Sequence, residues 1–280
     1  MRVFTTIKSL QKALHDLPNE ELIGFVPTMG ALHQGHLSLV NSAKSKADVV
    51  VVSIFVNPTQ FDKEADLVNY PSTLKADLAL LKKLDCDFVF TPSVVEMYGE
   101  NTKSISYDFD GLESVMEGAH RTGHFDGVGT IVKHLFEIVK PDYAFFGEKD
   151  FQQLQVIRKL VEKENLKLKI IGIPIHREED GLAMSSRNTR LTKEYRKAAP
   201  FIYKTLLAAK RKFGTKNAQE ISEWVTVSFK KHPLLALEYF TIADEETLLP
   251  IQNIEPTQKY RAFIAVFAGD IRLIDNIALY

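Results

Sequence analysis

The sequence lacks several features that mark specialised classes of protein. It contains a single cysteine, Cys86, so no disulfide can form within the chain, which suits a reducing compartment. It has no run of about 18 apolar residues that could span a membrane. Its N-terminal residues alternate polar and apolar side chains at helical spacing and lack the apolar stretch of a signal peptide. We therefore expect a cytoplasmic protein that does not bind a membrane, with Cys86 in its core.

An excess of charge of either sign is also missing. The chain of 280 residues has 35 Lys and Arg against 36 Asp and Glu, which gives a formal net charge of −1 at pH 7. Because there is no basic surplus or basic stripe, nucleic acid is not an expected partner. Hydrophobic residues make up 45% of the chain, which excludes a disordered protein and is enough for a packed core. A chain of this length most often divides into two domains.

In the N-terminal part, short apolar segments alternate with amphipathic ones, a pattern typical of βαβ units and a parallel sheet. The segment Asp48–Val56 is a near-continuous run of Val and Ile, which indicates a strand buried on both faces. We predict a Rossmann-like, doubly wound parallel α/β domain over residues 1–176. Its expected strands are Leu22–Pro27, Asp48–Val56, Cys86–Thr91, Tyr143–Phe146 and Leu168–Ile175, and its expected helices are Ser72–Leu84, Val128–Val139 and Phe151–Glu164.

After Pro174 this alternation ends. The polar segment Arg177–Asn188 is followed by two helical patterns and then by strand-like runs, an order that favours a smaller α+β domain over residues 177–280. The expected helices are Lys193–Phe213 and Ala218–Lys231, and the expected strands are Ala236–Ile242, Arg261–Val266 and the IRLID segment that follows Asp270.

The segment Pro27–Val40, PTMGALHQGHLSLV, contains the most informative pattern. It places Gly30 and the sequence His33-x-Gly35-His36 between an expected strand and an expected helix. A helix N-terminus offers backbone N–H groups and partial positive charge, and a residue without Cβ lets a phosphate approach the backbone. Two imidazoles there could donate hydrogen bonds to phosphate oxygens. The pattern favours a phosphate site over the alternative of a surface loop with two solvated histidines.

Two further segments carry groups suited to phosphate. GEKDFQQ, residues 147–153, ends an expected strand, and ligands bind at the carboxyl ends of strands in open parallel sheets. Lys149 offers a charge there, although an ordinary capped turn is an equal alternative. In MSSRN, residues 184–188, two hydroxyls and Arg187 could grip a triphosphate from a mobile lid. Taken alone, this second segment fits a Ser-rich hinge better.

Two other polar side chains are candidates for binding a small acid. Gln60, in FVNPTQF, presents an amide at the same expected sheet edge as the histidines, and an amide can donate and accept hydrogen bonds at once. Arg121 lies in a loop rich in Gly and His and could pair with a carboxylate or phosphate. Either residue alone is more often a solvated surface group.

In combination these motifs resemble the pantoate–β-alanine ligase family, which belongs to the nucleotidyltransferase superfamily with HIGH-like and KMSKS-like motifs and is distantly similar to class I aminoacyl-tRNA synthetases. The resemblance rests on VPTMGALHQGH, VVVSIFVNPTQF, RTGHFDGV, FFGEKDFQQ and DGLAMSSRN, in that order over Val26–Asn188, and on RLIDN near the C-terminus. It implies an ATP-dependent ligase that condenses pantoate with β-alanine to pantothenate through a pantoyl adenylate, releasing AMP and diphosphate. It also implies a homodimer formed through the N-terminal domain.

The resemblance further implies roles for individual residues. His36, with His33 beside it, would donate a proton or contact phosphate, and Lys149 and Arg187 would stabilise the charge that develops during adenylation. Gln60 and Gln153 would hold pantoate, and Gln60 would also lie near β-alanine. The residues expected to contact ATP are Met29, Gly30, Ala31, Leu32, His33, Gln34, Gly35, His36, Gly147, Glu148, Lys149, Asp150, His176, Met184, Ser185, Ser186 and Arg187.

Two positions depart from the usual pattern of the family. Thr59 stands where NPMQF is commoner, and it borders the pocket expected for the acid. Ala76 and Asp77 occupy a place where many members carry two acids, one of them linked to magnesium. Asp77 is therefore the expected metal contact, while Mg²⁺ is expected to be held mainly by the triphosphate of ATP.

Two other functions remain open from the residues. A nucleotidyltransferase that leaves the nucleotide on its product also uses H-x-G-H, although the glutamines at the sheet edge favour a small hydroxy acid. An RNA-binding relative of the synthetases is the non-enzymatic alternative, and the balanced charge disfavours it.

Overall fold

The computed structural model describes residues 1–62, 64–251, 253–255 and 257–280. Its contacts divide the chain into two compact units. The first comprises Met1–Glu148 and Gln152–Pro174, and the second comprises Lys149–Phe151 and Ile175–Tyr280. The short segment Lys149–Phe151 therefore groups with the C-terminal part of the chain. The division into a nucleotide- and pantoate-binding domain at 1–176 and a lid at 177–280 stays a prediction.

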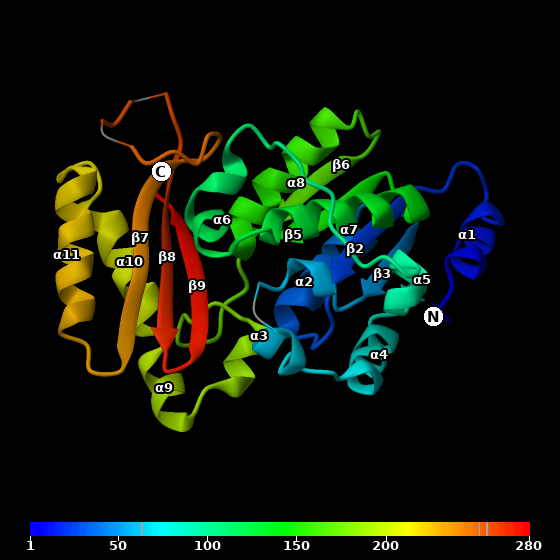
Figure 1. Cartoon of the computed structure of the whole chain (residues 1–280), viewed down its shortest axis with the longest axis horizontal. Helices are drawn as coiled ribbons and strands as arrows, with labels where there is room; N and C mark the ends of the chain where they lie inside the picture. Colours follow the sequence, from blue (N-terminus) through cyan, green and yellow to red (C-terminus); the bar gives the residue numbers. More distant parts are fainter. Residues whose placement is uncertain (63, 252, 256) are drawn as a thin grey trace. The chain divides into compact units, whose positions relative to one another are not determined.

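The first unit is built on a six-stranded sheet in the order β1-β4-β3-β2-β5-β6, and every neighbouring pair is parallel (Figure 1). This confirms the predicted doubly wound α/β fold. The chain runs outward from β2 to β3 and β4, and it then returns to the other side of β2 to form β5. The strands are β1 (Arg2–Phe4), β2 (Ile23–Thr28), β3 (Val49–Ile54), β4 (Phe88–Phe90), β5 (Tyr143–Gly147) and β6 (Lys169–Ile173).

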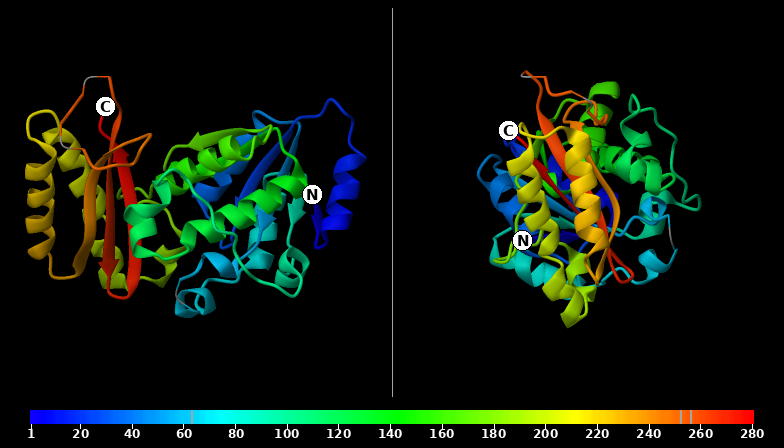
Figure 2. Two further views of the ribbon diagram at one scale, coloured as in Figure 1. Left: turned by 45° about the horizontal axis from the view of Figure 1, so that its top comes forward. Right: turned by 90° about the vertical axis from the view of Figure 1, so that its left-hand side faces the viewer.

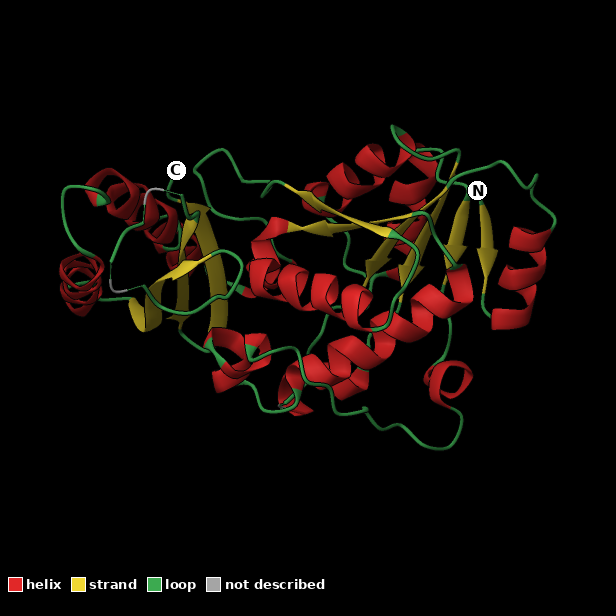
Figure 3. Ribbon diagram, turned by 90° about the horizontal axis from the view of Figure 1, so that it is seen from above, coloured by secondary structure: helices red, strands yellow, loops and turns green. Residues whose placement is uncertain are grey.

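Helices cover both faces of this sheet (Figure 3). Leu39 and Leu81 bring α2 and α4 onto the face that carries Val26. On the opposite face Phe136 of α7 makes edge-on ring contacts with Phe25 and with Phe146. The helical segments of this unit are α1 (Ile7–His15), α2 (Gln34–Lys44), η1 (Pro58–Gln60), α3 (Glu64–Val68), α4 (Leu74–Lys83), α5 (Val94–Tyr98), η2 (Leu112–Ser114), α6 (Met116–His120) and α7 (His124–Val139), followed by η3 (Glu148–Asp150) and α8 (Phe151–Lys163), which cross between the units.

Three aspartates close the amino end of the sheet. Asp48 accepts a hydrogen bond from Leu22 N at 2.9 Å, Asp87 from Val50 N at 2.9 Å, and Asp142 from Ile23 N at 2.8 Å. Each carboxylate satisfies a backbone donor at or near the start of a neighbouring strand. The substrate-binding residues that we expect follow the carboxyl ends of the strands, so these aspartates lie at the other end of the sheet.

The second unit carries an antiparallel three-stranded sheet in the order β7-β8-β9. Helices α10 and α11 pack on it through Ile202, Leu206 and Val225, which share a buried core with Ile264 of the central strand (Figures 1 and 2). The elements are η4 (Ser186–Arg190), α9 (Lys193–Ala198), α10 (Phe201–Lys212), α11 (Ala218–Lys230), β7 (Leu235–Asp244), β8 (Tyr260–Ala268) and β9 (Ile271–Ala278).

Several elements differ from the prediction: the short helices α3, α5 and α6 were not expected, and β1, α7 and α9 also differ. The three-residue strand β1 was not expected, because its length gives no alternating pattern to detect. Helix α7 begins at His124, before the expected Val128, because Gly123 precedes it with a φ of 73°. The single helix expected over Lys193–Phe213 is wrong: α9 ends at Ala198, and Pro200, which has no backbone N–H, stands immediately before α10.

No helix in the described ranges combines the length and the apolarity that crossing a bilayer requires.

Candidate active site

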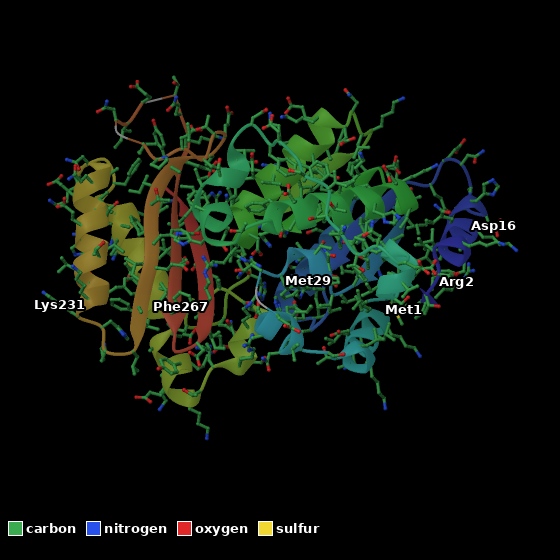
Figure 4. All side chains as sticks on the ribbon, in the orientation of Figure 1. Met1, Arg2, Asp16, Met29, Lys231 and Phe267 are labelled. Atoms are coloured by element: carbon green, nitrogen blue, oxygen red, sulfur yellow. The ribbon has the colours of Figure 1, made fainter. Side chains whose placement is uncertain are left out.

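The loop after β2 begins at Met29, which Figure 4 labels, and turns sharply at the two residues that follow. Gly30 and Ala31 have φ values of 83° and 50°. A Cβ on Gly30 would stand 3.1 Å from Ile54 Cγ2 and 3.2 Å from Asp77 Oδ2, so both the conformation and the space favour glycine. Two successive left-handed residues turn consecutive backbone N–H groups in one direction and form a small anion-binding nest.

The carboxylate of Asp77 occupies this nest. Ala31 N donates to Asp77 Oδ2 at 3.0 Å, and Leu32 N donates to Asp77 Oδ1 at 2.8 Å. The sequence predicts that the N–H groups at the start of α2 and the backbone beside Gly30 face a phosphate. Since the N–H groups of Ala31 and Leu32 bind a side chain of the protein itself, a nucleotide at this loop would have to be contacted by other groups of Met29–His36.

The two imidazoles provide such groups. His33 is the N-cap of α2: its Nδ1 accepts from Gly35 N at 3.1 Å, and His36 Nδ1 accepts from His33 N at 3.3 Å. The rings lie 4.1 Å apart between centroids. Because each Nδ1 accepts a backbone hydrogen bond, the proton of each neutral ring is on Nε2. The helix cap therefore fixes both histidines as Nε2–H donors.

A buried amide network surrounds Gln60. Asn57, only 1% exposed, donates through Nδ2 to Gln60 Oε1 at 3.2 Å and to Gly127 O at 3.1 Å. The Nε2 of Gln60 donates to Met29 Sδ at 2.9 Å. Thioether sulfur is a weak acceptor, so a ligand oxygen would be a better partner for this N–H. Gln60 thus faces Met29 with its donor end.

The other side of Asn57 is held by hydroxyl groups. Asn57 Oδ1 accepts from Tyr98 OH at 2.6 Å and from Thr59 Oγ1 at 3.1 Å. Burial raises the pKa of Tyr98, which keeps its hydroxyl protonated as a donor. The hydroxyl of Thr59, the residue that departs from the family pattern, therefore binds Asn57 and so supports the orientation of Gln60.

Arg121 and His124 hold the backbone of Gln60. His124 Nδ1 lies 2.8 Å from Gln60 O and must donate, because a carbonyl oxygen only accepts; its Nε2 then accepts from Arg121 Nη1 at 3.1 Å. Arg121 Nε also lies 3.5 Å from the carboxylate of Asp62. Arg121 is thus engaged with protein groups and is not a merely solvated loop residue.

The two glutamines after β5 differ in environment. Gln152 is buried and fully engaged: Glu117 N donates to its Oε1 at 3.0 Å, and its Nε2 donates to Leu112 O and Val115 O, both at 2.8 Å. This amide therefore holds the loop before α6. Gln153, the expected pantoate ligand, is half-buried in the first turn of α8.

In the second unit, Lys149 is held by the C-terminal strands. Asn276 of β9, 2% exposed, donates through Nδ2 to Lys149 O at 2.9 Å, and its Oδ1 accepts from Arg261 Nη1 at 2.6 Å. Arg261 also stacks on the ring of Phe151 at 3.9 Å from the centroid. The Nζ of Lys149 lies 3.6 Å from the carboxylate of Asp150. The RLIDN segment thus fixes the backbone of the lysine expected to stabilise charge.

The expected nucleotide contacts His176 and Met184 are also joined in this unit. Met184 N donates to His176 O at 3.0 Å, beside a bridge between Arg177 and Ala183. Ser185 caps η4 by accepting from Arg187 N at 3.2 Å. Arg177 pairs bidentately with Asp275 at 2.7 and 2.9 Å, and burial raises the pKa of the Asp275 carboxyl while this arginine opposes that rise.

The expected residues thus form two groups. Within the first unit the structure brings together Met29–His36, Gln60 and Asp77. Within the second it brings Lys149 and Asp150 onto the C-terminal sheet and joins His176 to the loop of Met184–Arg187. Their convergence on one nucleotide stays a prediction.

Sequence reasoning missed Asn57, His124 and Asn276. All three stood inside quoted motifs, FVNPTQF, RTGHFDGV and RLIDN, but only their burial and contacts identify them as supports for Gln60 and Lys149.

The residues do not form a dedicated metal site. Across the described ranges no group of three or more His, Cys, Asp or Glu could hold a metal ion. Both oxygens of Asp77 already accept backbone hydrogen bonds. That a magnesium ion would enter on the triphosphate of ATP stays a prediction.

Comparisons with known proteins agree with these motifs. The sequence profile of the family described as pantoate-beta-alanine ligase matches residues 2–278. The pantothenate synthetase of Christiangramia forsetii is 56% identical over 281 residues, covering 100% of this chain and 99% of that protein. The pantothenate synthetase of Flavobacterium psychrophilum is 54% identical over 276 residues, covering 98% and 97%.

Solved structures extend the likeness to the whole fold. The crystal structure of pantothenate synthetase from Thermus thermophilus superposes with a TM-score of 0.92 at 41% identity, covering 100% of each chain. The pantoate-beta-alanine ligase from Francisella tularensis, in complex with beta-gamma ATP and beta-alanine, gives a TM-score of 0.83 at 37% identity, covering 100% of this chain and 98% of that one. Profile, identity and fold therefore agree that this chain belongs to the pantoate–β-alanine ligase family.

Proposed function

We propose that this ligase condenses pantoate with β-alanine to form pantothenate, through a pantoyl-adenylate intermediate, with release of AMP and diphosphate. In the first step a carboxylate oxygen of pantoate attacks the α-phosphorus of ATP, and the bond to diphosphate breaks. In the second step the amine of β-alanine attacks the acyl carbon, the amide forms, and AMP leaves with the electron pair of the broken C–O bond. Adenylation is needed because a free carboxylate resists attack by an amine.

The contact between Gln60 and Met29 is the observation that carries this proposal. It places the amide expected to bind the acid 2.9 Å from the first residue of the loop expected to bind the nucleotide. The Nε2 of Gln60 would donate to an oxygen of pantoate, and Asn57 would keep it in that orientation. A carboxylate held there would lie next to the loop that leads to the histidines of α2, and attack on a phosphate requires the two reactants to be held close together.

His33 and His36 would supply the electrostatic part of catalysis. With their protons fixed on Nε2, both rings would donate to phosphate oxygens as negative charge shifts toward diphosphate. Lys149 and Arg187 would add positive charge, and Gln153 would complete the pantoate site. Mg²⁺ carried by the triphosphate would neutralise phosphate charge when bound.

The test is a product assay on the purified full-length chain. With ATP and pantoate alone, we expect diphosphate formation to stop once each active site holds an adenylate. Adding β-alanine should give AMP and pantothenate in equal amounts. AMP release that ignores β-alanine, or a nucleotide left on the final product, would contradict amide synthesis. The homodimer and the cytoplasmic location stay predictions, and sedimentation of the purified chain would test the first.

Binding measurements test the assignment of Gln60 separately. Gln60→Ala should raise the KM for pantoate about 10-fold or more, which corresponds to loss of one hydrogen bond of roughly 1.5 kcal/mol, and leave ATP affinity nearly unchanged. Gln152→Ala is a poor comparison, because Gln152 holds backbone carbonyls. A defect of Gln60→Ala confined to ATP would refute the role in binding pantoate.

A further inference from the structure

Three protein donors surround the carboxylate of Asp77. Its side chain projects from α4 and is only 2% exposed. Oδ2 accepts from Ala31 N at 3.0 Å and Oδ1 from Leu32 N at 2.8 Å. Thr73 Oγ1 lies 3.2 Å from Oδ1 and 3.1 Å from Oδ2, at the position that precedes α4. Both oxygens are thus bound by protein donors.

These contacts oppose a metal role. Mg²⁺ demands near-octahedral oxygen ligands and usually keeps several waters, so a carboxylate that binds it needs a lone pair directed at the ion and space beside it. Asp77 is buried and its two oxygens share three donors. The group does not fit a magnesium ligand.

The same contacts connect Asp77 to the orientation of His33 and His36. It holds the left-handed turn at Gly30 and Ala31 by binding the two N–H groups that this turn directs together. Leu32 is followed directly by His33, the N-cap of α2, which is bound to His36 through the capping hydrogen bonds. Fixing the backbone of Leu32 therefore fixes where the helix begins and where the two Nε2–H groups point.

We propose that Asp77 is a positioning residue that anchors the loop after β2 and aims His33 and His36, and that it does not bind magnesium. The expected effect of Asp77 on catalysis rests on the proposed function, whereas its role in holding the loop does not. Removing one acceptor oxygen should loosen the loop without unfolding the sheet, and it should lower the rate of adenylation rather than the affinity for metal.

A spectroscopic test needs no substrate. In the ¹⁵N-labelled full-length protein, the amide protons of Ala31 and Leu32 should resonate downfield, as N–H groups bound to carboxylate do, and Mg²⁺ should leave them unchanged. In Asp77→Asn both should move upfield, because an amide side chain offers one acceptor in place of two. Movement of these two signals on Mg²⁺ titration of the wild type, or no movement in the variant, would overturn the proposal.

A kinetic test separates positioning from metal binding. For Asp77→Asn we expect kcat to fall about 10- to 100-fold, as small displacements of catalytic groups do, with the half-saturating Mg²⁺ concentration unchanged. Thr73→Val, which removes the hydroxyl but keeps the shape, should give a smaller loss of kcat in the same direction. If Asp77→Asn does not fold, the kcat and the half-saturating Mg²⁺ concentration of Thr73→Val test the proposal instead.

The matched control is Asp142→Asn. Asp142 also binds a backbone N–H through its carboxylate, but at the amino end of the sheet, and asparagine keeps an acceptor for Ile23 N. The kcat of Asp142→Asn should equal that of the wild type. Rescue of Asp77→Asn by high Mg²⁺, or a wild-type kcat in Thr73→Val, would refute positioning. An inactive wild type would instead refute the proposed reaction, and the amide shifts would still decide the role of Asp77.

Discussion

At the scale of single residues, each histidine of the H-x-G-H motif binds the backbone through Nδ1, while the proposed mechanism assigns contact with phosphate to Nε2. Nδ1 of His33 and of His36 accepts a backbone hydrogen bond at the start of α2, which leaves the proton on Nε2. The two tasks can be separated, because asparagine places an oxygen near the position of Nδ1 and glutamine places a nitrogen near that of Nε2.

Two substitutions of His36 should therefore behave differently. His36→Asn should keep the cap and the stability but lower kcat about 100-fold, the loss typical of one donor to a developing charge. His36→Gln should retain more activity but lose about 1 kcal/mol of unfolding free energy with the cap. Turnover and urea unfolding measure the two effects. Equal stability together with equal activity in both variants would mean that the ring nitrogens do not divide the tasks in this way.

Cys86 is a second residue whose environment determines its chemistry. It is 1% exposed, and burial, with the nearby charge of Asp87 adding to it, raises the pKa of its thiol to about 12. Because almost no thiolate forms at about pH 8, iodoacetamide should not label the native protein. Labelling should begin only in denaturant, and Cys86→Ser should keep its activity. Rapid labelling of the native protein without loss of structure would contradict the buried assignment.

At the scale of elements, the hairpin that joins His176 to Met184 depends on an ion pair at its turn. Asp180 binds Arg196 of α9 and also accepts from Leu182 N at 3.2 Å. The hydrogen bond from Arg196 lowers the pKa of the Asp180 carboxyl below its ordinary value of 3.8. A lowered acid pKa stabilises the folded state above the ordinary pKa, and this contribution shrinks below the ordinary value and is lost as the pH falls through the lowered pKa of the folded state.

The direction of this pKa shift predicts how Asp180→Asn changes stability with pH. At neutral pH it should be less stable than the wild type by about 0.5 kcal/mol or less, since the pair is partly exposed and screened by solvent. The difference should shrink as the pH falls below the ordinary pKa of 3.8. Asparagine still accepts from Leu182 N, so the comparison isolates the charge. Unfolding free energies measured from about pH 7 to about pH 3 check this, and a difference that grows on acidification would contradict it.

The elements also show what a sequence can and cannot predict. The run of valines in β3 is buried along its whole length, so this central strand of the parallel sheet could be predicted from its local pattern. The leucine spacing in α4 predicts the helix, although of these leucines Leu81 is buried and Leu74 is exposed. Asp77 could not be assigned, because it binds Ala31, which is 46 residues away in the sequence. Likewise Asn57 meets Gly127 O across 70 residues. Long-range polar contacts leave no local periodicity, whereas strands and helices do.

At the scale of the whole chain, the C-terminal strand reaches back to a residue of the central segment. Asn276 and Lys149 are 127 residues apart, and the Asn276 side chain is the link between β9 and the Lys149 carbonyl. If Lys149 stabilises charge as proposed, this hydrogen bond and the stacking of Arg261 on Phe151 connect the C-terminal sheet to that lysine. The arrangement explains why RLIDN, far from the other motifs, belongs with them.

A double-mutant cycle tests this link. Asn276→Ala should lower kcat about 10-fold by loosening the backbone of Lys149, and Lys149→Ala should lower it further by removing the charge. If Asn276 acts through Lys149, adding Asn276→Ala to Lys149→Ala should change kcat less than about twofold, because residues that act as one unit are not additive. Independent effects would multiply to the full product of the two losses. Asn276 would then serve only the stability of the C-terminal sheet, which Arg261 and Asp275 also support, and the lysine would be positioned by its own turn.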